Sequence, residues 1–249
     1  MTITFIGHGY VGLVTASVFA DLGNKVWVIG HTKEKIENLK RGIIPIYEPG
    51  LQEIVERNIK AKRLLFTLDY KEAIPESKIV FIAVGTPPKV NGEADLSVVF
   101  SVAKKIARNI DRYTIVVTKS TVPVETYKKI KEIIEGEKPQ SASFDVASIP
   151  EFLREGQAIS DTLHPDRIVI GTESKKAQDL LVELHSPIDG NYVLTNIETA
   201  EVIKYASNAF LATKISFANA IAHLSELTGA DGLSVLKGIG LDKRIGSEF

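Results

Sequence analysis

Short apolar runs alternate with amphipathic stretches along the first two thirds of the chain. The apolar runs predict strands at residues 3–6, 26–29, 79–84, 114–117, 144–147 and 167–170. The stretches between them predict helices at residues 11–21 and 33–40 and three more that begin near residues 97, 124 and 175, and Gly23 is expected to end the first. Continuous apolar strands are buried on both faces, so the alternation favours a doubly wound, mostly parallel α/β sheet. Residues 42–69 are expected to be an elaboration inserted into its first half.

One long stretch, residues 197–228, contains neither proline nor glycine and is rich in Ala, Leu, Ile and Glu. A single helix of this length would extend roughly 48 Å, and we expect it to bridge domains or subunits. Two shorter helices joined by a turn are the alternative. Gly229 is expected to end the helix, and residues 238–249, with three glycines, are expected to form a loop.

Composition narrows the function classes. With 249 residues, 44% of them hydrophobic, the chain can bury a sizeable core, and its formal net charge of -1 argues against a nucleic-acid or membrane-surface partner. No apolar run reaches about 18 residues, and the N-terminus resembles a strand rather than a targeting segment, so we expect a cytoplasmic location. The chain has no cysteine. Disulfides, thiolate metal sites and thiol catalysis within these residues are therefore excluded, and no metal is expected.

A glycine motif lies between the first predicted strand and the first predicted helix. Gly7, Gly9 and Gly12 have the spacing GxGxxG. Such glycines permit a tight turn and a close approach of the backbone to a phosphate, and the following helix presents unpaired amide groups to an anion. The motif alone is a weak signal, but a second strand and helix follow at the expected distance. The sequence therefore predicts a pyrophosphate site here, in a dinucleotide-binding domain over residues 1–196.

The second strand departs from the pattern of dinucleotide-binding domains at its end. An acidic residue usually follows about 20 residues after the glycines and accepts hydrogen bonds from the adenosine ribose. This chain has Gly30 there, followed by His31, Thr32 and Lys33. Loss of the carboxylate removes a group that would repel a 2′-phosphate. Two hypotheses stay open: the cofactor preference has moved toward NADP, or NAD binding is merely weakened.

Six motifs follow one another along the chain: GHGYVGL (7–13), PIYEPG (45–50), GTPP (85–88), STVP (120–123), PEFLREG (150–156) and GIGLD (238–242). Motifs in this order resemble the UDP-glucose/GDP-mannose dehydrogenase family, most closely the members that act on UDP-glucose. The resemblance covers the whole chain. Family members oxidise C6 of a nucleotide sugar from alcohol to carboxylate with two NAD molecules in succession. It implies a Rossmann-like domain, a long helix that also forms a dimer contact, and a second domain for the nucleotide sugar. Residues 197–249 would then be the connecting helix and part of a helical dimerisation region.

The resemblance implies roles for individual residues. The cofactor-binding set is Gly7, Gly9, Tyr10, Val11, Gly12, Gly30, His31, Lys35, Gly85, Thr86, Thr121 and Glu155. The catalytic set is Thr121, Glu151, Lys204 and Asn208, and the substrate-binding set is Glu151, Phe152, Leu153, Arg154, Lys204 and Asn208. Glu151 would lie near a catalytic water, although a solvated helix face is the alternative for Glu151 and Glu155. Lys204 and Asn208, four residues apart on one helix face, would stabilise negative charge on the sugar oxygen.

Two further departures limit this implied function. Ile149 stands where the family usually has Asn, and the chain stops before the glycine-rich loop that carries the family's nucleophilic cysteine. Without a thiol, the second oxidation cannot proceed through a thioester. We therefore expect a nicotinamide dinucleotide to bind, a nucleotide sugar to bind weakly or not at all, and a homodimer through the long helix.

Two alternative functions remain. One is a non-catalytic NAD(P)-binding or dimerisation module. The other is a one-step β-hydroxyacid dehydrogenase, which shares the glycine motif and the Lys-x-x-x-Asn pair but lacks the PIYEPG and PEFLREG runs present here. Dinucleotide binding without turnover would distinguish the module from an enzyme.

Overall fold

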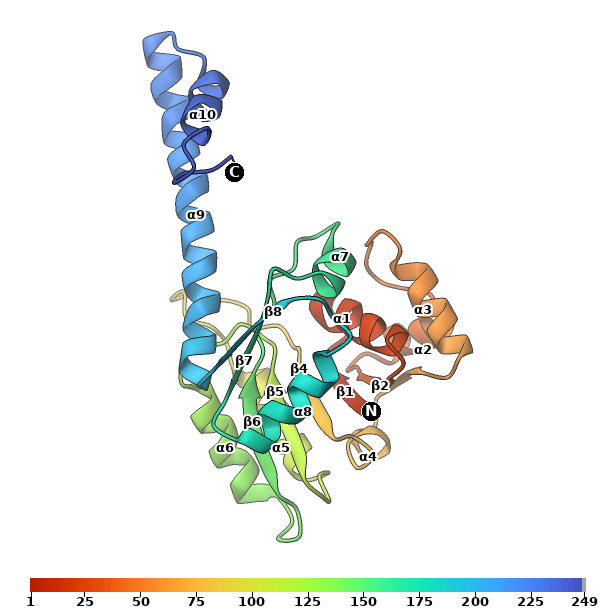
Figure 1. Ribbon diagram of the computed structural model, residues 1–249. Helices are drawn as coiled ribbons and strands as arrows, with labels where there is room; N and C mark the ends of the chain where they lie inside the picture. Colours follow the sequence, from red (N-terminus) through yellow and green to blue (C-terminus); the bar gives the residue numbers. More distant parts are fainter. Residues whose placement is uncertain (248–249) are drawn as a thin grey trace. The chain divides into compact units, whose positions relative to one another are not determined.

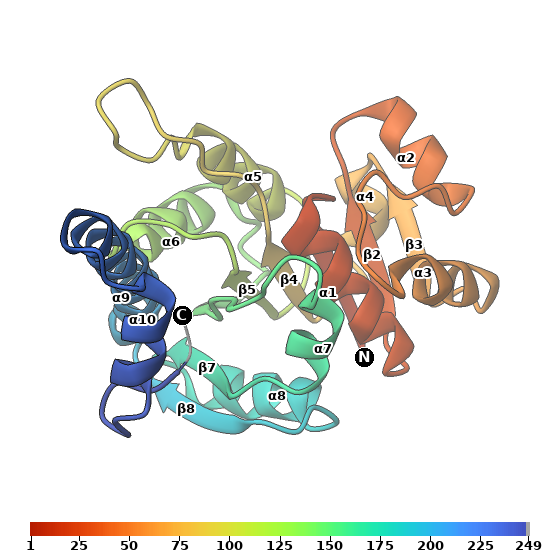
Figure 2. The same ribbon diagram turned by 90° about the horizontal axis from the view of Figure 1, so that it is seen from above.

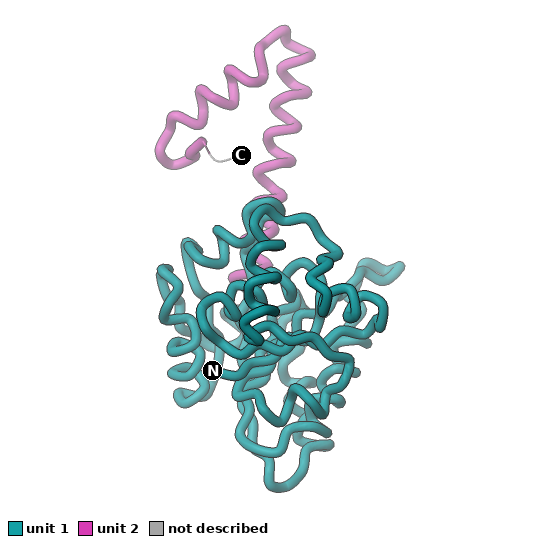
Figure 3. The backbone as a smooth tube through the Cα atoms, turned by 90° about the vertical axis from the view of Figure 1, so that its right-hand side faces the viewer, with its two compact units in different colours: residues 1–202 teal, residues 203–249 magenta. Residues whose placement is uncertain are grey.

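The computed structural model describes residues 1–247, which divide into two compact units, Met1–Val202 and a second unit from Ile203 onward (Figure 3). The first unit holds an eight-stranded sheet (Figure 1). Its strands are β1 (Thr2–Ile6), β2 (Lys25–Ile29), β3 (Leu64–Thr67), β4 (Ile79–Ile82), β5 (Thr114–Thr118), β6 (Phe144–Ser148), β7 (Arg167–Thr172) and β8 (Asn191–Thr195).

The strand order is β3-β2-β1-β4-β5-β6-β7-β8. Neighbouring strands run parallel except for β6 and β7, which pair antiparallel over two registered positions. The order reverses between β1 and β4, so chain connections leave this point in opposite directions. The prediction of a doubly wound, mostly parallel sheet is confirmed, and its switch point is where ligands bind in such sheets.

Helices cover both faces of this sheet (Figure 2). The helices of the first unit are α1 (Tyr10–Asp21), α2 (Lys33–Lys40), α3 (Leu51–Lys60), α4 (Tyr70–Ala73), α5 (Ser97–Ala107), α6 (Thr126–Glu137), α7 (Ala158–Leu163), α8 (Lys175–His185) and the start of α9 (Ile197–Thr228). Apolar side chains of α1, α3 and α8 pack on one face with Phe5 and Phe81, whose rings stack 4.4 Å apart. Those of α5 and α6 pack on the other face with Ile6 and Ile82. Alternate residues of each strand thus enter opposite cores.

The predicted elements are present with small shifts of their ends, but residues 42–69 are not a mere insertion. They contain α3 and the edge strand β3, which pairs parallel with β2 from Val26 to Ile29. The expectation of an elaboration was therefore wrong, because this segment supplies an edge strand of the sheet. Strand β8 was also missed, since it is largely exposed at the other edge and lacks a continuous apolar run.

Residues 197–228 form one uninterrupted helix, as expected, and the alternative of two helices is wrong. Gly229 follows it with a positive φ of 74°, which is the backbone conformation that commonly ends helices at glycine. The expected loop at residues 238–249 is only partly correct, because α10 (Gly232–Gly240) includes the first three of these residues. Asp231 caps α10 by accepting a hydrogen bond from the Leu233 amide. Aspartate is a preferred N-cap residue, so the sequence did contain a sign of this helix beside its glycines. Residues 248–249 of that segment lie outside the described residues.

Candidate functional site

The glycine turn joins β1 to α1, and two of its glycines are required by close packing. Gly7 has a φ of +117°, and a Cβ there would lie 2.2 Å from the carbonyl oxygen of Ala83. A Cβ on Gly12 would lie 2.3 Å from the carbonyl oxygen of Gly7. Both contacts are far shorter than van der Waals distance, so no other residue fits without a shift of the backbone.

Gly9 has the opposite environment. It is the exposed N-cap of α1, and a Cβ placed on it would meet no atom within 4 Å. No side chain caps this helix end. The amides of Tyr10, Val11 and Gly12 therefore begin a helix whose partial positive charge faces open space. This combination of a tight turn with an uncovered helix N-terminus is suited to a diphosphate.

A cavity of about 360 Å³ adjoins the turn at the switch point of the sheet. Its wall includes the ends of β1 and β2, Val84 from the loop after β4, the residues Gly30 and His31, and side chains of α5. Lys105 of α5 lines it and lies 5.2 Å from the centre of the Tyr70 ring, which also lines it. A flat ring bound here would meet both aromatic and aliphatic surface. The cavity therefore fits the adenosine part of a dinucleotide that enters beside the glycine turn.

The loops after β4 and β5, predicted for the nicotinamide side, lie together. The Thr86 hydroxyl donates to the Thr121 carbonyl at 2.8 Å, and the Ser120 hydroxyl donates to the Val84 carbonyl at 2.6 Å. Gly85 is exposed, and a Cβ placed on it would meet no atom within 4 Å, so the backbone there is accessible to a ligand. The two segments therefore form one surface at the carboxyl end of the sheet.

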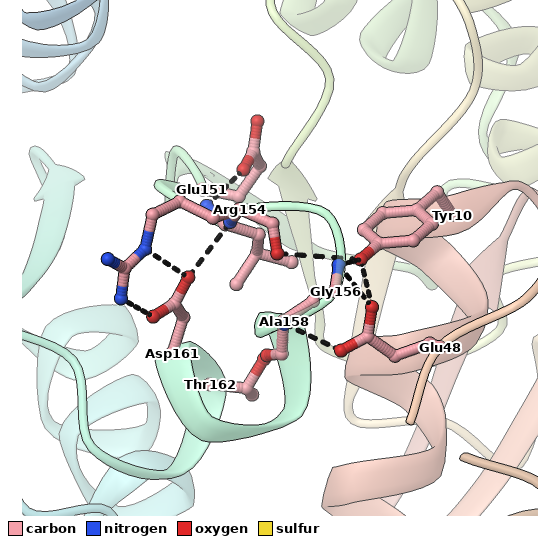
Figure 4. A network of polar contacts seen from close by, with 9 residues as sticks. Tyr10, Glu48, Glu151, Arg154, Gly156, Ala158, Asp161 and Thr162 are labelled. Atoms are coloured by element: carbon pink, nitrogen blue, oxygen red, sulfur yellow. Dashed lines mark hydrogen bonds and ion pairs between the residues drawn. The ribbon is translucent and has the colours of Figure 1, made fainter. Parts of the chain in front are cut away.

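The loop that carries Glu151 is held by its own polar groups (Figure 4). The Glu151 carboxylate accepts a hydrogen bond from the Leu153 amide at 2.7 Å. Arg154 forms an ion pair with Asp161 at 2.6 Å, and the ring of Phe152 lies 4.0 Å from the guanidinium of Arg167. Glu151 is half-buried and Arg154 is exposed. The side chains of Phe152 and Arg154 thus fix the shape of this loop.

Glu48 connects this loop to the glycine turn and was not among the predicted site residues. Its carboxylate accepts a hydrogen bond from the Tyr10 hydroxyl and from the amides of Gly156 and Ala158, the last two at 2.8 Å each (Figure 4). Burial alone would raise the pKa of Glu48, but these bonds hold it below its usual range. Burial and the bond to Glu48 raise the pKa of Tyr10 to about 12. The PIYEPG motif contained Glu48, but nothing in the sequence indicated its partners.

A second buried carboxylate, Glu201, was also missed. It lies on the first turns of α9, within the first unit, and accepts a hydrogen bond from the Glu125 amide at 2.9 Å. Its other oxygen has no hydrogen-bond partner in the described part of the chain. Burial, and more weakly the neighbouring carboxylates of Glu198 and Glu125, raise the pKa of Glu201 to about 7. The raised pKa places the ionisation of Glu201 near neutral pH, and its carboxylate is bound by the amide of Glu125, four residues after Thr121.

The remaining predicted residues are placed as follows. Lys204 and Asn208 lie on α9 in the second unit, where Lys204 is buried and Asn208 is exposed. Glu155 is exposed near Tyr10. Ile149, the departure noted in the sequence, is 3% exposed and belongs to the core beneath the sheet. An apolar residue is therefore suited to that position.

No candidate for a membrane span is found among residues 1–247, since none of their helices combines sufficient length with sufficient hydropathy.

Comparison with known proteins shows two consecutive matches. Residues 1–189 match the NAD binding domain of the UDP-glucose/GDP-mannose dehydrogenase family, and residues 198–249 match the central domain of that family. The UDP-glucose 6-dehydrogenase TuaD of Bacillus subtilis is 52% identical over 99% of this chain, which covers 54% of that protein. A UDP-glucose 6-dehydrogenase of Rhizobium meliloti is 50% identical over the whole chain, which covers 58% of it.

Solved structures give the same result. A UDP-glucose dehydrogenase from Pyrobaculum islandicum has a TM-score of 0.96 at 41% identity, with 99% of this chain and 58% of that one covered. A GDP-mannose dehydrogenase from Pseudomonas aeruginosa has a TM-score of 0.94 at 36% identity, with 97% and 57% covered. The chain thus spans little more than half the length of these relatives. The chain belongs to the UDP-glucose/GDP-mannose dehydrogenase family.

Proposed function

We propose that this chain is the dinucleotide-binding part of a nucleotide-sugar 6-dehydrogenase that converts UDP-glucose to UDP-glucuronate with NAD. The observation that carries the proposal is the open N-terminus of α1 at Gly9, next to two glycines that packing requires. Residues 1–196 would be the dinucleotide-binding domain, and residues 197–249 the connecting helix with part of a helical dimerisation region. UDP-glucose is proposed as the substrate because the relatives of Bacillus subtilis and Rhizobium meliloti are UDP-glucose 6-dehydrogenases.

The amides of Tyr10, Val11 and Gly12 would hold the diphosphate, and the surface formed by Gly85, Thr86 and Thr121 would face the nicotinamide. The bound dinucleotide would supply the hydride acceptor. The tie between Thr86 and Thr121 keeps two adjoining loops at a fixed spacing, which supports an ordered contact surface. Lys35 would reach the adenosine ribose, and Glu155 would lie at the edge of the cofactor site.

Substrate-side roles are proposed for the loop 151–154 and for two residues of α9. Glu151 would position water, with Phe152, Leu153 and Arg154 shaping the substrate side. Lys204 and Asn208 would stabilise negative charge on the sugar oxygen, as an ammonium and an amide donor can. These residues belong to two separate units of the chain, so their roles are carried over one by one from the family.

The 249 residues contain no cysteine, so they cannot provide the thiol that the second oxidation uses in this family. We therefore expect dinucleotide binding without sustained oxidation of UDP-glucose by these residues alone. Binding of the sugar nucleotide should be weak or absent. The alternative is a non-catalytic NAD(P)-binding or dimerisation module. This alternative also predicts dinucleotide binding without turnover by these residues.

A homodimer through α9 is also part of the proposal. Phe210 and Phe217 on this helix are 65% and 54% exposed, and large exposed apolar side chains on a helix are typical of an interface. The molar mass in solution, measured by light scattering, should be that of two chains. A monomer at high protein concentration would contradict this part.

Calorimetric titration with oxidised and reduced NAD tests the cofactor site, and absorbance of the reduced cofactor in the presence of UDP-glucose tests turnover. We expect binding heat and a higher melting temperature with NAD, with no sustained turnover. Absence of both heat and stabilisation with every nicotinamide dinucleotide would refute the proposal. Sustained turnover would refute the expectation that these residues stop short of the full reaction.

A further inference from the structure

The end of β2 lacks a carboxylate, and the glycine in its place, Gly30, is closely packed against Ile36. A Cβ on Gly30 would lie 2.5 Å from Cδ1 of Ile36 and 2.7 Å from its Cγ1. Ile36 is 1% exposed in the core, so a side chain at position 30 would require Ile36 to change its rotamer. In dinucleotide-binding folds an acid at this place bonds the ribose 2′-hydroxyl, whereas a cation nearby accommodates a 2′-phosphate. Glycine at position 30 therefore removes the feature that selects the unphosphorylated cofactor.

Two histidines border the space beside Gly30. The rings of His8 and His31 lie 5.0 Å apart, and His8 Nδ1 would be 3.1 Å from a Cβ on Gly30. His8 is 5% exposed, yet its Nδ1 has no hydrogen-bond partner among residues 1–247. Buried polar atoms in folded proteins are almost always paired. An unpaired nitrogen that faces this space indicates a missing polar partner.

The N-terminus of α2 follows immediately and carries positive charge. Thr32 is its N-cap, but the Thr32 side chain does not bond the helix amides. Lys33 and Lys35 are exposed in the first turn, and neither forms an ion pair within the described chain. Glu34 is the acidic residue of that turn and is exposed as well. The helix dipole, two lysines and one glutamate together leave a net positive site.

The charge also acts on the histidines. Burial, and then the positive charges of His31 and Lys35, lower the pKa of His8, so Lys35 lies close enough to act on the same space. His31 lines the adjoining 360 Å³ cavity together with Gly30 and Lys105. The wall that would receive the adenosine is therefore continuous with the positive end of α2.

We propose that this end of β2 and α2 is a 2′-phosphate subsite, so that this chain binds NADP more tightly than NAD, the cofactor named in the proposed function. The 2′-phosphate would accept hydrogen bonds from the first-turn amides of α2, from the Thr32 hydroxyl and from a ring N–H of His31, with Lys35 supplying charge. Helix N-termini bind phosphate in this manner. The inference rests on the proposed dinucleotide site at the glycine turn. It opposes the hypothesis that Gly30 merely weakens NAD binding.

Competing titrations of the full chain with NAD, NADP, 5′-ADP and 2′,5′-ADP test the subsite. One charge-assisted hydrogen bond contributes about 1.5–3 kcal/mol, so NADP should bind at least about tenfold more tightly than NAD, and 2′,5′-ADP more tightly than 5′-ADP. Rising salt should weaken NADP binding more than NAD binding. The single tryptophan, Trp27 on β2, provides a fluorescence signal independent of heat.

Substitutions at the exposed lysine localise the effect. K35Q should reduce the NADP-to-NAD affinity ratio by about tenfold, and K35E should reduce it further by repulsion. The matched control K129Q, an exposed lysine on α6, should leave the ratio unchanged. Melting curves check that each variant is folded.

The outcomes separate the two proposals. If no dinucleotide binds, the proposed function itself fails. If NAD binds and NADP binds equally or more weakly, or if K35Q lowers both affinities alike, the proposed function stands and the 2′-phosphate subsite is overturned.

Discussion

The hydroxyl of Tyr10 donates a hydrogen bond to the carboxylate of Glu48, and this pair joins the glycine turn to the loop that carries Glu151. Tyr10 is the first residue of α1, whose amide end faces the proposed diphosphate. Glu48 in turn accepts hydrogen bonds from the amides of Gly156 and Ala158, at the end of that loop. The cofactor side and the substrate side of the proposed site therefore share one buried carboxylate, and movement of one is constrained by the other.

Removal of the Glu48 carboxylate should destabilise the first unit. E48A leaves the Tyr10 hydroxyl and two amides without their acceptor, so we expect the free energy of unfolding to fall by about 2–4 kcal/mol. E48Q retains one carbonyl oxygen and should have a smaller effect. Y10F removes one hydrogen bond and should lower the free energy of unfolding by about 1 kcal/mol. Chemical denaturation measured by circular dichroism gives these values.

The matched control for Glu48 is E53Q, an exposed glutamate on α3. It should change the free energy of unfolding by less than about 0.5 kcal/mol. If E48A were as mild as this control, the carboxylate would not hold the two loops together.

The sheet could largely be predicted from the sequence because its central strands are buried on both faces. Strands such as β4, with four fully buried residues, appear as continuous apolar runs. The edge strands β3 and β8 could not be found in this way. β3 includes a half-buried position and β8 mixes exposed and half-buried positions, so neither is the fully buried run that marks a central strand.

The site divides along a similar line. The glycine turn was predictable because its residues are adjacent in sequence, although the contact that requires glycine at position 7 comes from the distant Ala83. Glu48 and Glu201 were not, since their partners lie far along the chain, at separations of 108 residues for Glu48 with Gly156 and 76 for Glu201 with Glu125. Only the sheet topology brings these segments together, and a single sequence contains no signal for such pairs.

Gly9 should be essential for binding but nearly dispensable for folding. A Cβ at Gly9 meets no atom within 4 Å, and its φ of -74° suits any residue. G9A should therefore lower the free energy of unfolding by less than about 1 kcal/mol, mainly through the weaker N-cap. A methyl group at the phosphate approach should lower dinucleotide affinity by about tenfold or more.

Calorimetry with NAD and NADP measures the effect of G9A, and G136A on α6 is its control. Gly136 also has open space around a Cβ but lies in a helix remote from the turn, so G136A should bind normally and gain a few tenths of a kcal/mol from helix propensity. Normal dinucleotide binding by G9A would show that the diphosphate lies elsewhere.

Gly7 should behave in the opposite way to Gly9. G7A combines a positive φ of +117° with a contact of 2.2 Å to the Ala83 carbonyl oxygen, and that backbone belongs to the neighbouring loop. We expect a loss of about 3 kcal/mol or more in the free energy of unfolding, because strain and steric overlap add. A melting temperature equal to that of G136A would contradict the turn geometry.

Glu201 should make the stability of the first unit depend on pH near neutrality. Its pKa is raised by burial to about 7 in the folded state, against 4.5 for an unperturbed glutamate, so the folded state binds more protons between these values. The contribution of Glu201 to the free energy of unfolding is therefore fully present below about pH 4.5 and is lost as pH rises through about 7.

The variant E201Q tests this dependence, because it keeps a neutral acceptor for the Glu125 amide and removes the ionisation. The variant should melt at a higher temperature than the parent at pH 8, with a flatter profile from pH 5 to 8, both as differences on the order of a few degrees. The control E198Q changes a partly exposed carboxylate that accepts a hydrogen bond from the Tyr127 hydroxyl. Its melting temperature should depend on pH with the same slope as that of the parent. Parallel pH profiles for E201Q and the parent would show that Glu201 is already ionised at pH 5, despite its burial.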